Sequence, residues 1–413
     1  MAEGQQTGSE NNQALAGVKV LDFMWAMAGP GSTRILADYG ATVVRVESTT
    51  RFDAVRMVGP FQNKQPGPNN SGLYNNMNTG KLPMTLNLSK PESRDIIFDL
   101  VRWADVVTES FSPKAMREWG FDYESLTKIK PDIIMLSTCL MGQTGPHSHF
   151  AGFGNLAAAV SGFFDPTGWP DREPAGPFGA YTDYIAPWYN AAAVLAALEH
   201  KHQTGKGQHI DLAQAEAALH FLAPFLLDQT VNGRTQTRMG NRDMNFAPHG
   251  VYQSAGEDRW VAIGVETDDQ WRSLCETMNR PDLGSDERLA TVKGRLANQD
   301  EIDKAINAWS NQFSPYEAEE KLQAKNVPAS AVETINELYE DKQLQHREHF
   351  VDLDHPDFGK TTVEGTRFKF SRTPAQINPV APTLGRENQS VLENILGYDE
   401  ERITELVIAE VLE

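Results

Sequence analysis

The sequence has little cysteine. Its 413 residues include only Cys139 and Cys275, too few for a disulfide framework. Neither cysteine belongs to a CxxC motif or a Cys/His cluster, so the sequence contains no recognisable structural zinc site and no metal is predicted. Free thiols are typical of a reducing compartment, and a cytoplasmic location is therefore expected.

Basic residues and long apolar runs are also scarce. The chain has 37 Lys and Arg against 56 Asp and Glu, a formal net charge of -19. Because proteins that bind nucleic acid or anionic membranes present basic surfaces, neither partner is expected. The longest apolar stretch, around 191–198, is far shorter than the roughly 18 residues of a membrane span. The polar segment 1–17 has no signal-peptide layout. The net charge does not exclude binding of a small polyanionic ligand, since such a ligand needs only a local cluster of cations.

Several common catalytic and nucleotide-binding motifs are missing. The sequence contains no P-loop, no GxSxG and no HExxH motif. The segment 28–32, Ala-Gly-Pro-Gly-Ser, matches only the start of a dinucleotide fingerprint, because Arg34 and Ile35 stand where its third glycine would fall. A turn over 29–31 that starts a helix at 32 is therefore preferred to an NAD or FAD site.

The remaining sequence predicts an α/β protein. Hydrophobic residues make up 40% of the chain, as in soluble globular proteins. Strands rich in β-branched residues alternate with helical segments, which is typical of a parallel sheet. The predicted strands are 18–23, 41–47, 86–88, 105–108, 133–139 and 209–212, with a long Gly/Pro/Asn-rich loop over 51–80. We expect a large doubly wound, Rossmann-like domain plus a smaller α+β domain.

The domain boundaries are predicted from shifts in composition. Residues 1–229 form the N-terminal part of the large domain and 230–335 form the small domain. Residues 336–413 return to the large domain as a C-terminal segment. The small domain should contain strands at 250–253 and 260–265 and helices near 268–278 and 301–309. A strand-like run follows at 361–370.

Asp183 is the most informative carboxylate. It precedes a long alanine-rich helix that is expected to begin near Pro187. An aspartate in this place caps free backbone N–H groups at a helix start, and on the residues alone that role is favoured. The same position would also hold a carboxylate ionised and accessible, as a nucleophile requires.

Several stretches, in order, resemble class III CoA-transferases, the CaiB/BaiF family. They include the opening LAGVKVLDF…AGPGSTRILADYGATVVRVES, then NTGK, DVVTESFSP and GQTGP. The most specific is YTD at 181–183 with its trailing ALEHKHQTGKGQHIDLAQAEA, and APTLGRENQSVLENILGY resembles the closing motif. The chain resembles most the branch that transfers CoA from succinyl-CoA to benzylsuccinate.

The resemblance implies an activity and a mechanism. The protein would move CoA from an acyl-CoA donor to a carboxylic acid acceptor. Asp183 would attack the donor thioester, forming an aspartyl anhydride and then an aspartyl-CoA thioester. Gly142, in the glycine-rich turn, is the candidate for oxyanion support. CoA is a substrate, and no tightly bound cofactor is expected.

The resemblance also implies binding residues. CoA phosphates need local cations, and the candidate CoA contacts are Arg56, Asn78, Lys81, Ser110 and Arg117. Ser110 replaces an asparagine of the family pattern, and Glu118 stands where an arginine is common, with Arg117 beside it. An apolar acyl pocket is predicted from Trp25, Met27, Phe153 and Tyr181.

Two alternative functions and the assembly state stay open. An α-methylacyl-CoA racemase would need a catalytic histidine, but Phe153 and Gly154 occupy that stretch. A CoA-binding subunit of a heteromeric transferase is the other alternative. Family members form interlocked dimers, so an interlocked homodimer, or a heterodimer with a paralogous subunit, is expected.

Overall fold

The computed structural model describes residues 13–384, 386 and 388–413, so most of the predicted polar leader lies outside the described residues. The chain divides into two compact units. The larger unit combines Met1–Phe164, Gly176–Thr235 and Gln345–Glu413, and the smaller unit combines Asp165–Ala175 with Gln236–Leu344. The domain boundaries near 229 and 335 stay a prediction.

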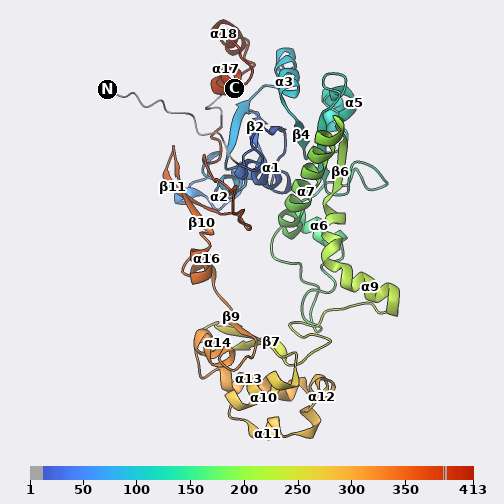
Figure 1. Ribbon diagram of the computed structural model, residues 1–413, viewed down its shortest axis with the longest axis vertical. Helices are drawn as coiled ribbons and strands as arrows, with labels where there is room; N and C mark the ends of the chain where they lie inside the picture. The colour runs from blue at the N-terminus through green and yellow to red at the C-terminus, as the bar shows by residue number, and fades with distance from the viewer. Residues whose placement is uncertain (1–12, 385, 387) are drawn as a thin grey trace. The chain divides into compact units, whose positions relative to one another are not determined.

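A six-stranded parallel sheet forms the centre of the larger unit (Figure 1). The strand order is β3-β2-β1-β4-β5-β6, the order of a doubly wound fold. The strands are β1 (Lys19–Asp22), β2 (Thr42–Glu47), β3 (Lys81–Thr85), β4 (Val106–Glu109), β5 (Ile134–Cys139) and β6 (His209–Ala213). This confirms the predicted mixed α/β class with a parallel sheet.

Helices cover both faces of the sheet. Neighbouring side chains on a strand point to opposite faces, so each strand contributes to both cores. Leu21, Val44 and Val107 pack on one face with α3 (Pro91–Trp103), α17 (Asn388–Asn394) and α18 (Glu400–Ile408). Val20, Val43 and Val106 pack on the other face with α1 (Ala28–Asp38) and α7 (Tyr181–Thr204). The last helices of the chain thus complete a core that its first strand begins.

Shorter helices complete the larger unit. They are α2 (Gly72–Met77), α4 (Ala115–Trp119), α5 (Tyr123–Leu126), α6 (Gly154–Val160), α8 (Gln214–Leu219) and α9 (Ala223–Asn232). A two-stranded antiparallel hairpin joins β10 (Phe350–His355) to β11 (Gly359–Glu364). The smaller α16 (Lys342–His346) precedes this hairpin.

The smaller unit is an α+β arrangement. Its antiparallel sheet has the order β7-β8-β9, with β7 (His249–Gln253), β8 (Trp260–Gly264) and β9 (Ala329–Ala331). The helices are α10 (Asp268–Thr277), α11 (Pro281–Gly284), α12 (Val292–Ala297), α13 (Gln299–Ser310), α14 (Pro315–Gln323) and α15 (Ile335–Leu338). Trp271, Leu274 and Ile306 are buried against Val261 and Ile263 to form a separate core.

Several local predictions are wrong. The strand expected at 86–88 lies earlier, as β3, because the buried Lys81 at its start hides the strand pattern. The segment 29–31 lies inside α1 instead of forming a turn before it. The loop at 51–80 contains α2 and two short 3-10 turns, Ala54–Met57 and Gln62–Lys64. The helix expected to begin near Pro187 begins earlier, at Tyr181. Pro187 lies inside the helix, although proline lacks the N–H group that a helix interior normally uses.

Candidate active site

A cavity of about 330 Å³ opens at the edge of the large sheet where the strands end. Parallel strands end on one common edge, and ligands of doubly wound sheets bind there, where the strand order reverses. The reversal lies between β1 and β4. Residues that follow four different strands line the cavity, namely Trp25 and Ala26 after β1, Ser110 and Phe111 after β4, Leu140 after β5 and Gln214 after β6.

Aromatic side chains make much of the cavity wall. Trp25, Phe111, Phe150 and Phe153 all line it. Trp25 and Phe111 meet edge to face, with ring centroids 5.5 Å apart, and the exposed fraction of Phe153 is 62%. Such a wall suits an apolar acyl group.

Asp183 lies on the wall of the same cavity. It is the third residue of α7, whose first turn therefore carries its carboxylate, and only 6% of the residue is exposed. Ala180, the residue before the helix, makes no side-chain cap. The partial positive charge of a helix start favours an anion at this position. The sequence had indicated that Asp183 precedes the helix. In the structure, Asp183 lies within the first turn of α7.

Each oxygen of the Asp183 carboxylate accepts a hydrogen bond. The backbone N–H of Gly154 donates to Oδ2 at 3.3 Å, and the side-chain amide of Gln214 donates to Oδ1. Burial raises the pKa of the Asp183 carboxyl above its ordinary value, whereas the bonds from Gln214 and Gly154 act in the opposite direction. A carboxylate of raised basicity that is still held ionised is well suited to nucleophilic attack.

Gly154 approaches Asp183 closely because it has no side chain. A Cβ atom at this position would lie 2.7 Å from the Asp183 carboxyl carbon and 2.8 Å from the Ala180 carbonyl oxygen. Any other residue would therefore push the carboxylate away or unwind the start of α6. Gly154 was noted in the sequence only as a residue that replaces a histidine, and its contact with Asp183 was not anticipated.

Gln214 was missed by sequence reasoning. It is buried and directly follows β6, so its side chain emerges at the sheet edge where Ser110 also lies. A polar residue immediately after a buried parallel strand was the signal that could have identified it. Its separation from Asp183, 31 residues along the chain, gave no local pattern to recognise.

Cys139 also lines the cavity but is a poor nucleophile. Burial raises the pKa of its thiol to about 11. Since the thiolate is the reactive form, the side chain stays protonated and unreactive at neutral pH. Among the nucleophilic side chains at this cavity, Asp183 is therefore the one prepared for attack.

Two of the predicted CoA contacts, Arg56 and Lys81, are buried and fully engaged. The Lys81 ammonium donates to Asp22 Oδ2 at 3.0 Å, to the Pro30 carbonyl at 2.9 Å and to Asn78 Oδ1 at 2.9 Å. These bonds use all three of its donors. The Arg56 guanidinium pairs with both oxygens of Glu47, at 3.0 and 2.7 Å. A role of either cation in binding CoA stays a prediction that this geometry does not support.

The other predicted CoA contacts divide into two groups. Ser110 lines the cavity, and its hydroxyl accepts a hydrogen bond of 2.8 Å from the Trp25 backbone N–H. Asn78 is buried and donates to the Tyr74 carbonyl at 3.0 Å. Arg117 is exposed on α4, outside the residues that line the cavity. Of these three residues, only Ser110 lines the same cavity as Asp183.

The remaining predicted site residues also separate. Trp25 and Phe153 line the cavity, whereas Met27 packs in a core cluster with Tyr74, and Tyr181 packs against Phe163 at a centroid distance of 5.4 Å. Gly142 has a φ of 84° and faces Asp211. Its predicted oxyanion role stays a prediction, because the donors that reach Asp183 come from other residues.

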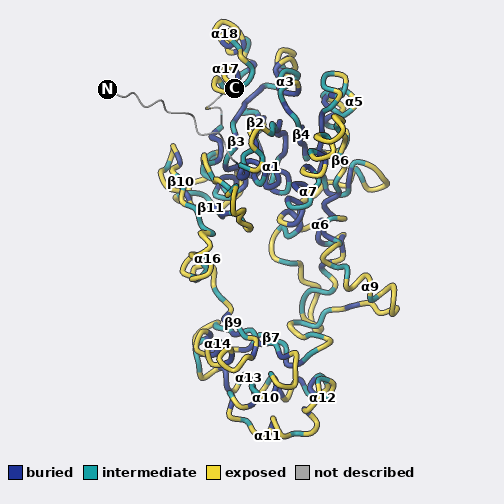
Figure 2. The backbone as a smooth tube through the Cα atoms, viewed as in Figure 1, coloured by how far each residue is buried: buried dark blue, intermediate teal, exposed yellow. Residues whose placement is uncertain are grey.

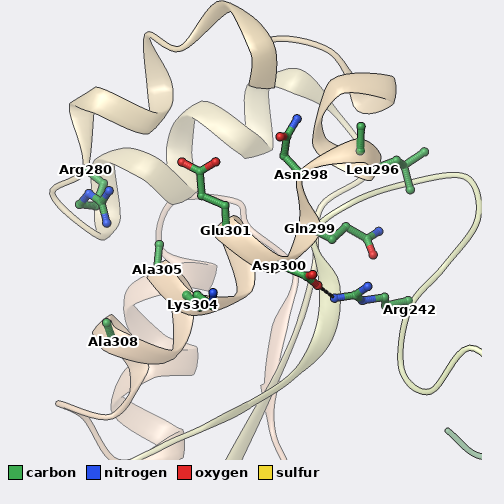
Figure 3. A pocket seen from close by; sticks show the side chains of 11 residues that line it. Arg242, Arg280, Leu296, Asn298, Gln299, Asp300, Glu301, Lys304, Ala305 and Ala308 are labelled. Carbon is green, nitrogen blue, oxygen red and sulfur yellow. Dashed lines mark hydrogen bonds and ion pairs between the residues drawn. The ribbon is translucent and has the colours of Figure 1, made fainter. Parts of the chain in front are cut away.

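A larger hollow in the smaller unit, of about 640 Å³, is a weaker candidate (Figure 3). Both arginines that line it are already paired, since Arg242 contacts Asp300 at 2.5 Å and Arg280 contacts Asp282 at 2.6 Å. The pKa of the Asp300 carboxyl is lowered by Arg242, so this acid is stabilised in its charged form and is not activated as a base or nucleophile.

The described part of the chain has no group of three or more His, Cys, Asp or Glu side chains placed to hold a metal ion. Over residues 13–384, 386 and 388–413, no helix combines the length and apolar character needed to cross a membrane. The candidate site consists of the cavity, its aromatic wall and the Asp183 carboxylate.

Comparisons with known proteins agree with one another along the chain. The family described as CoA-transferase family III matches residues 15–388. A succinate–glutarate CoA-transferase from Agrobacterium fabrum is 34% identical over 385 residues, which cover 92% of this chain and 95% of that protein. The beta subunit of a succinyl-CoA–L-malate CoA-transferase from Chloroflexus aurantiacus is 32% identical over 403 residues, or 97% and 98% of the two chains. A crystal structure of a CAIB/BAIF family protein from Brucella suis matches with a TM-score of 0.85 at 29% identity, covering 93% of this chain and 100% of that one. This chain therefore belongs to CoA-transferase family III and is a CoA-transferase.

Proposed function

We propose that this CoA-transferase moves CoA from succinyl-CoA to a dicarboxylic acid, with Asp183 as the nucleophile. The observation that carries the proposal is the Asp183 carboxylate on the wall of an apolar cavity, with one hydrogen-bond donor on each oxygen. The names of the relatives support the acid class, since they pair succinate or succinyl-CoA with glutarate and L-malate. The aromatic wall supports a substituted succinate such as benzylsuccinate as acceptor.

The proposed reaction begins with attack of an Asp183 oxygen on the thioester carbon of the donor. The C–S bond breaks, CoA leaves as its thiolate, and a mixed anhydride joins Asp183 to the donor acid. The thiolate then attacks the aspartyl carbonyl and releases the donor carboxylate, which leaves an aspartyl-CoA thioester. The acceptor carboxylate repeats these steps in reverse and takes CoA with it.

The cavity wall has a clear purpose in this reaction. Anhydrides and thioesters hydrolyse in water, so the intermediate survives only where water is excluded. Trp25, Phe111 and Phe153 line the cavity together with Asp183 and would limit access of water once the acyl group is bound. Burial in this apolar environment also raises the pKa of the Asp183 carboxyl, which makes the carboxylate more basic.

The assembly state is part of the proposal. We infer that the chain works as an interlocked dimer with a second copy of itself. A relative is named as a beta subunit, which supports a paralogous partner as the alternative. Exposed apolar residues on α9 support an interface of either kind; they are Phe225, Leu226, Leu227 and Val231.

The first test is replacement of the nucleophile. Asp183→Ala should abolish CoA transfer, because the other carboxylate that lines the cavity, Asp53, is paired with Arg45 at 2.7 Å. In the unaltered protein, incubation with succinyl-CoA followed by hydroxylamine or borohydride should modify Asp183, as read by peptide mass spectrometry. Glu216→Ala removes an exposed acid near the start of α8 and serves as the control. An Asp183→Ala protein that transfers CoA at the normal rate would refute the proposal.

Acceptor identity is tested by a screen with succinyl-CoA as donor. Dicarboxylic acids of four or more carbons, with and without an aromatic substituent, should yield CoA thioesters, whereas formate and the two-carbon dicarboxylate oxalate should not. If only the small acids react, the argument from the aromatic wall is wrong. If the chain expressed alone is inactive but becomes active with a second protein, the dimer contains a paralogous subunit.

The racemase alternative is not favoured. The relatives named above are transferases, and the residue that reaches Asp183 from the relevant stretch is Gly154, which cannot abstract a proton. A racemase would exchange the α-hydrogen of its acyl group for deuterium in heavy water, and no such exchange is expected here.

A further inference from the structure

We propose that the side-chain amide of Gln214 is a catalytic group, which stabilises the negative charge that develops on Asp183 Oδ1 during the reaction. The inference rests on the proposed role of Asp183 as nucleophile and assigns a residue that sequence reasoning had not considered. Gln214 and Asp183 line the same cavity, and the amide donates directly to the carboxylate. Both residues are buried, each only 6% exposed.

The local hydrogen-bond chain determines which end of the Gln214 amide faces Asp183. The Thr182 hydroxyl donates its only proton to the Gly154 carbonyl at 3.0 Å. Its oxygen can then act only as an acceptor towards Gln214, from which it receives a bond of 2.8 Å. The amide therefore presents its NH₂ group to this side, and the second N–H of that group points to Asp183 Oδ1.

The two oxygens of Asp183 are consequently not equivalent. Oδ1 accepts the close contact from Gln214, whereas Oδ2 accepts, among the described residues, only a long backbone bond of 3.3 Å from Gly154. Attack requires a lone pair that is weakly engaged, and a developing oxyanion requires a donor already in place. We therefore assign Oδ2 as the attacking atom and Oδ1 as the oxygen that becomes the aspartyl carbonyl.

The charge on Oδ1 changes in a defined way along the reaction. When Oδ2 bonds to the acyl carbon, the Asp183 carboxylate loses its charge and Oδ1 becomes a carbonyl oxygen. When the CoA thiolate adds to the carboxyl carbon of Asp183, the C–O π electrons move to Oδ1 and form an oxyanion. Collapse of this adduct breaks the bond between that carbon and Oδ2 and releases the donor carboxylate. The Gln214 N–H group faces Oδ1 throughout these steps.

The test uses Gln214→Met, which has a similar volume but no donor. The value of kcat should fall by roughly 10²–10³-fold, as for other single oxyanion donors, while the KM for acyl-CoA changes little. The acid limb of the kcat/KM profile should move to higher pH, because the bond from Gln214 lowers the pKa of Asp183. A purely structural residue would not move this limb. Gln208→Met changes an exposed glutamine and serves as the matched control.

The outcomes separate this inference from the proposed function. If Asp183→Ala is inactive and Gln214→Met has normal kcat and pH dependence, only the role of Gln214 is overturned. If Asp183→Ala is active, the proposed function itself falls. Should Gln214→Met fail to fold, Gln214→Glu keeps the shape of the side chain and replaces the donor with an acceptor. That variant should lose activity at pH 8, and full activity there would also overturn the inference.

Discussion

The carboxyl group of Glu109 shows how a single buried residue can organise the cavity. Glu109 ends β4, and its two oxygens accept from the Phe111 backbone N–H at 2.7 Å and from the Gln143 side chain at 3.3 Å. It thus ties together the segments that follow β4 and β5. Burial raises the pKa of this carboxyl to about 7, with a further rise from Asp211, against hydrogen bonds from Ser137 and Phe111.

This raised pKa makes stability depend on pH. In the unfolded chain a glutamate titrates near about 4.3, so between pH 4.3 and 7 the folded state holds a proton that the unfolded state has lost. The contribution of Glu109 is complete below the unfolded pKa and is lost as pH rises through 7. Glu109→Gln should therefore show a smaller fall in thermal midpoint between pH 5 and pH 8 than the unaltered protein.

The comparison depends on the pH slope and not on the absolute midpoint, because glutamine also weakens the bond to Phe111. Each unit of pKa shift corresponds to roughly 1.4 kcal/mol, so the difference in slope is measurable by calorimetry. Glu124→Gln, at an exposed glutamate, should follow the unaltered protein. Equal slopes for Glu109→Gln and the unaltered protein would show that Glu109 is ionised across this range.

At the scale of elements, buried ion pairs join the first three strands, from Asp22 at the carboxyl end of β1 to Lys81 at the amino end of β3. Asp22 on β1 contacts Lys81 on β3 at 3.0 Å, and Arg45 on β2 contacts Asp53 at 2.7 Å. Arg45 also contacts Glu47, at 3.2 Å. These side chains hold the segment after β1, because Asp53 also accepts from the Ala26 backbone N–H at 3.0 Å. The network thus positions one wall of the cavity, which Asp53 itself lines.

Lys81→Met tests this structural role against the predicted contact with CoA. Removal of the ammonium leaves Asp22 with one buried partner fewer, and the expected loss is about 3–5 kcal/mol, as for other broken buried pairs. The thermal midpoint should fall, whereas the KM for acyl-CoA of the folded fraction should stay the same. Lys64→Met, at an exposed lysine, should change neither quantity. A raised KM with a normal midpoint would instead support a phosphate contact.

At the scale of the whole molecule, α9 is a ten-residue helix with no buried residue (Figure 2). Leu227 is 59% exposed and Val231 is 76% exposed. Contiguous apolar side chains of this kind mark interaction surfaces, which agrees with the proposed dimer. We expect Leu227→Glu combined with Val231→Glu to shift the protein from dimer to monomer in sedimentation velocity experiments.

The control for this shift lies on the same helix. Thr230→Glu adds a charge at an exposed polar position and should leave the dimer intact. If the double variant sediments as the unaltered protein does, α9 lies outside the interface. If the unaltered protein is monomeric, the assembly proposal itself is wrong, while the roles of Asp183 and Gln214 within one chain are unaffected.

The sequence by itself determined the α/β class and the family. Runs such as 41–47 carry their β-branched pattern locally, and the family motifs are contiguous in the chain, so both can be read without knowing any distant contact. Asp183 was found in the same way, within its short YTD motif. Only the tertiary structure decided the partners of these residues. Gln214 and Gly154 lie 31 and 29 residues from Asp183 and meet it because α7 begins at the sheet edge where β6 ends. Lys81 was predicted as a contact for CoA, and the structure buries it against Asp22. Burial and long-range pairing arise when distant segments pack together, and no local pattern in the chain records them.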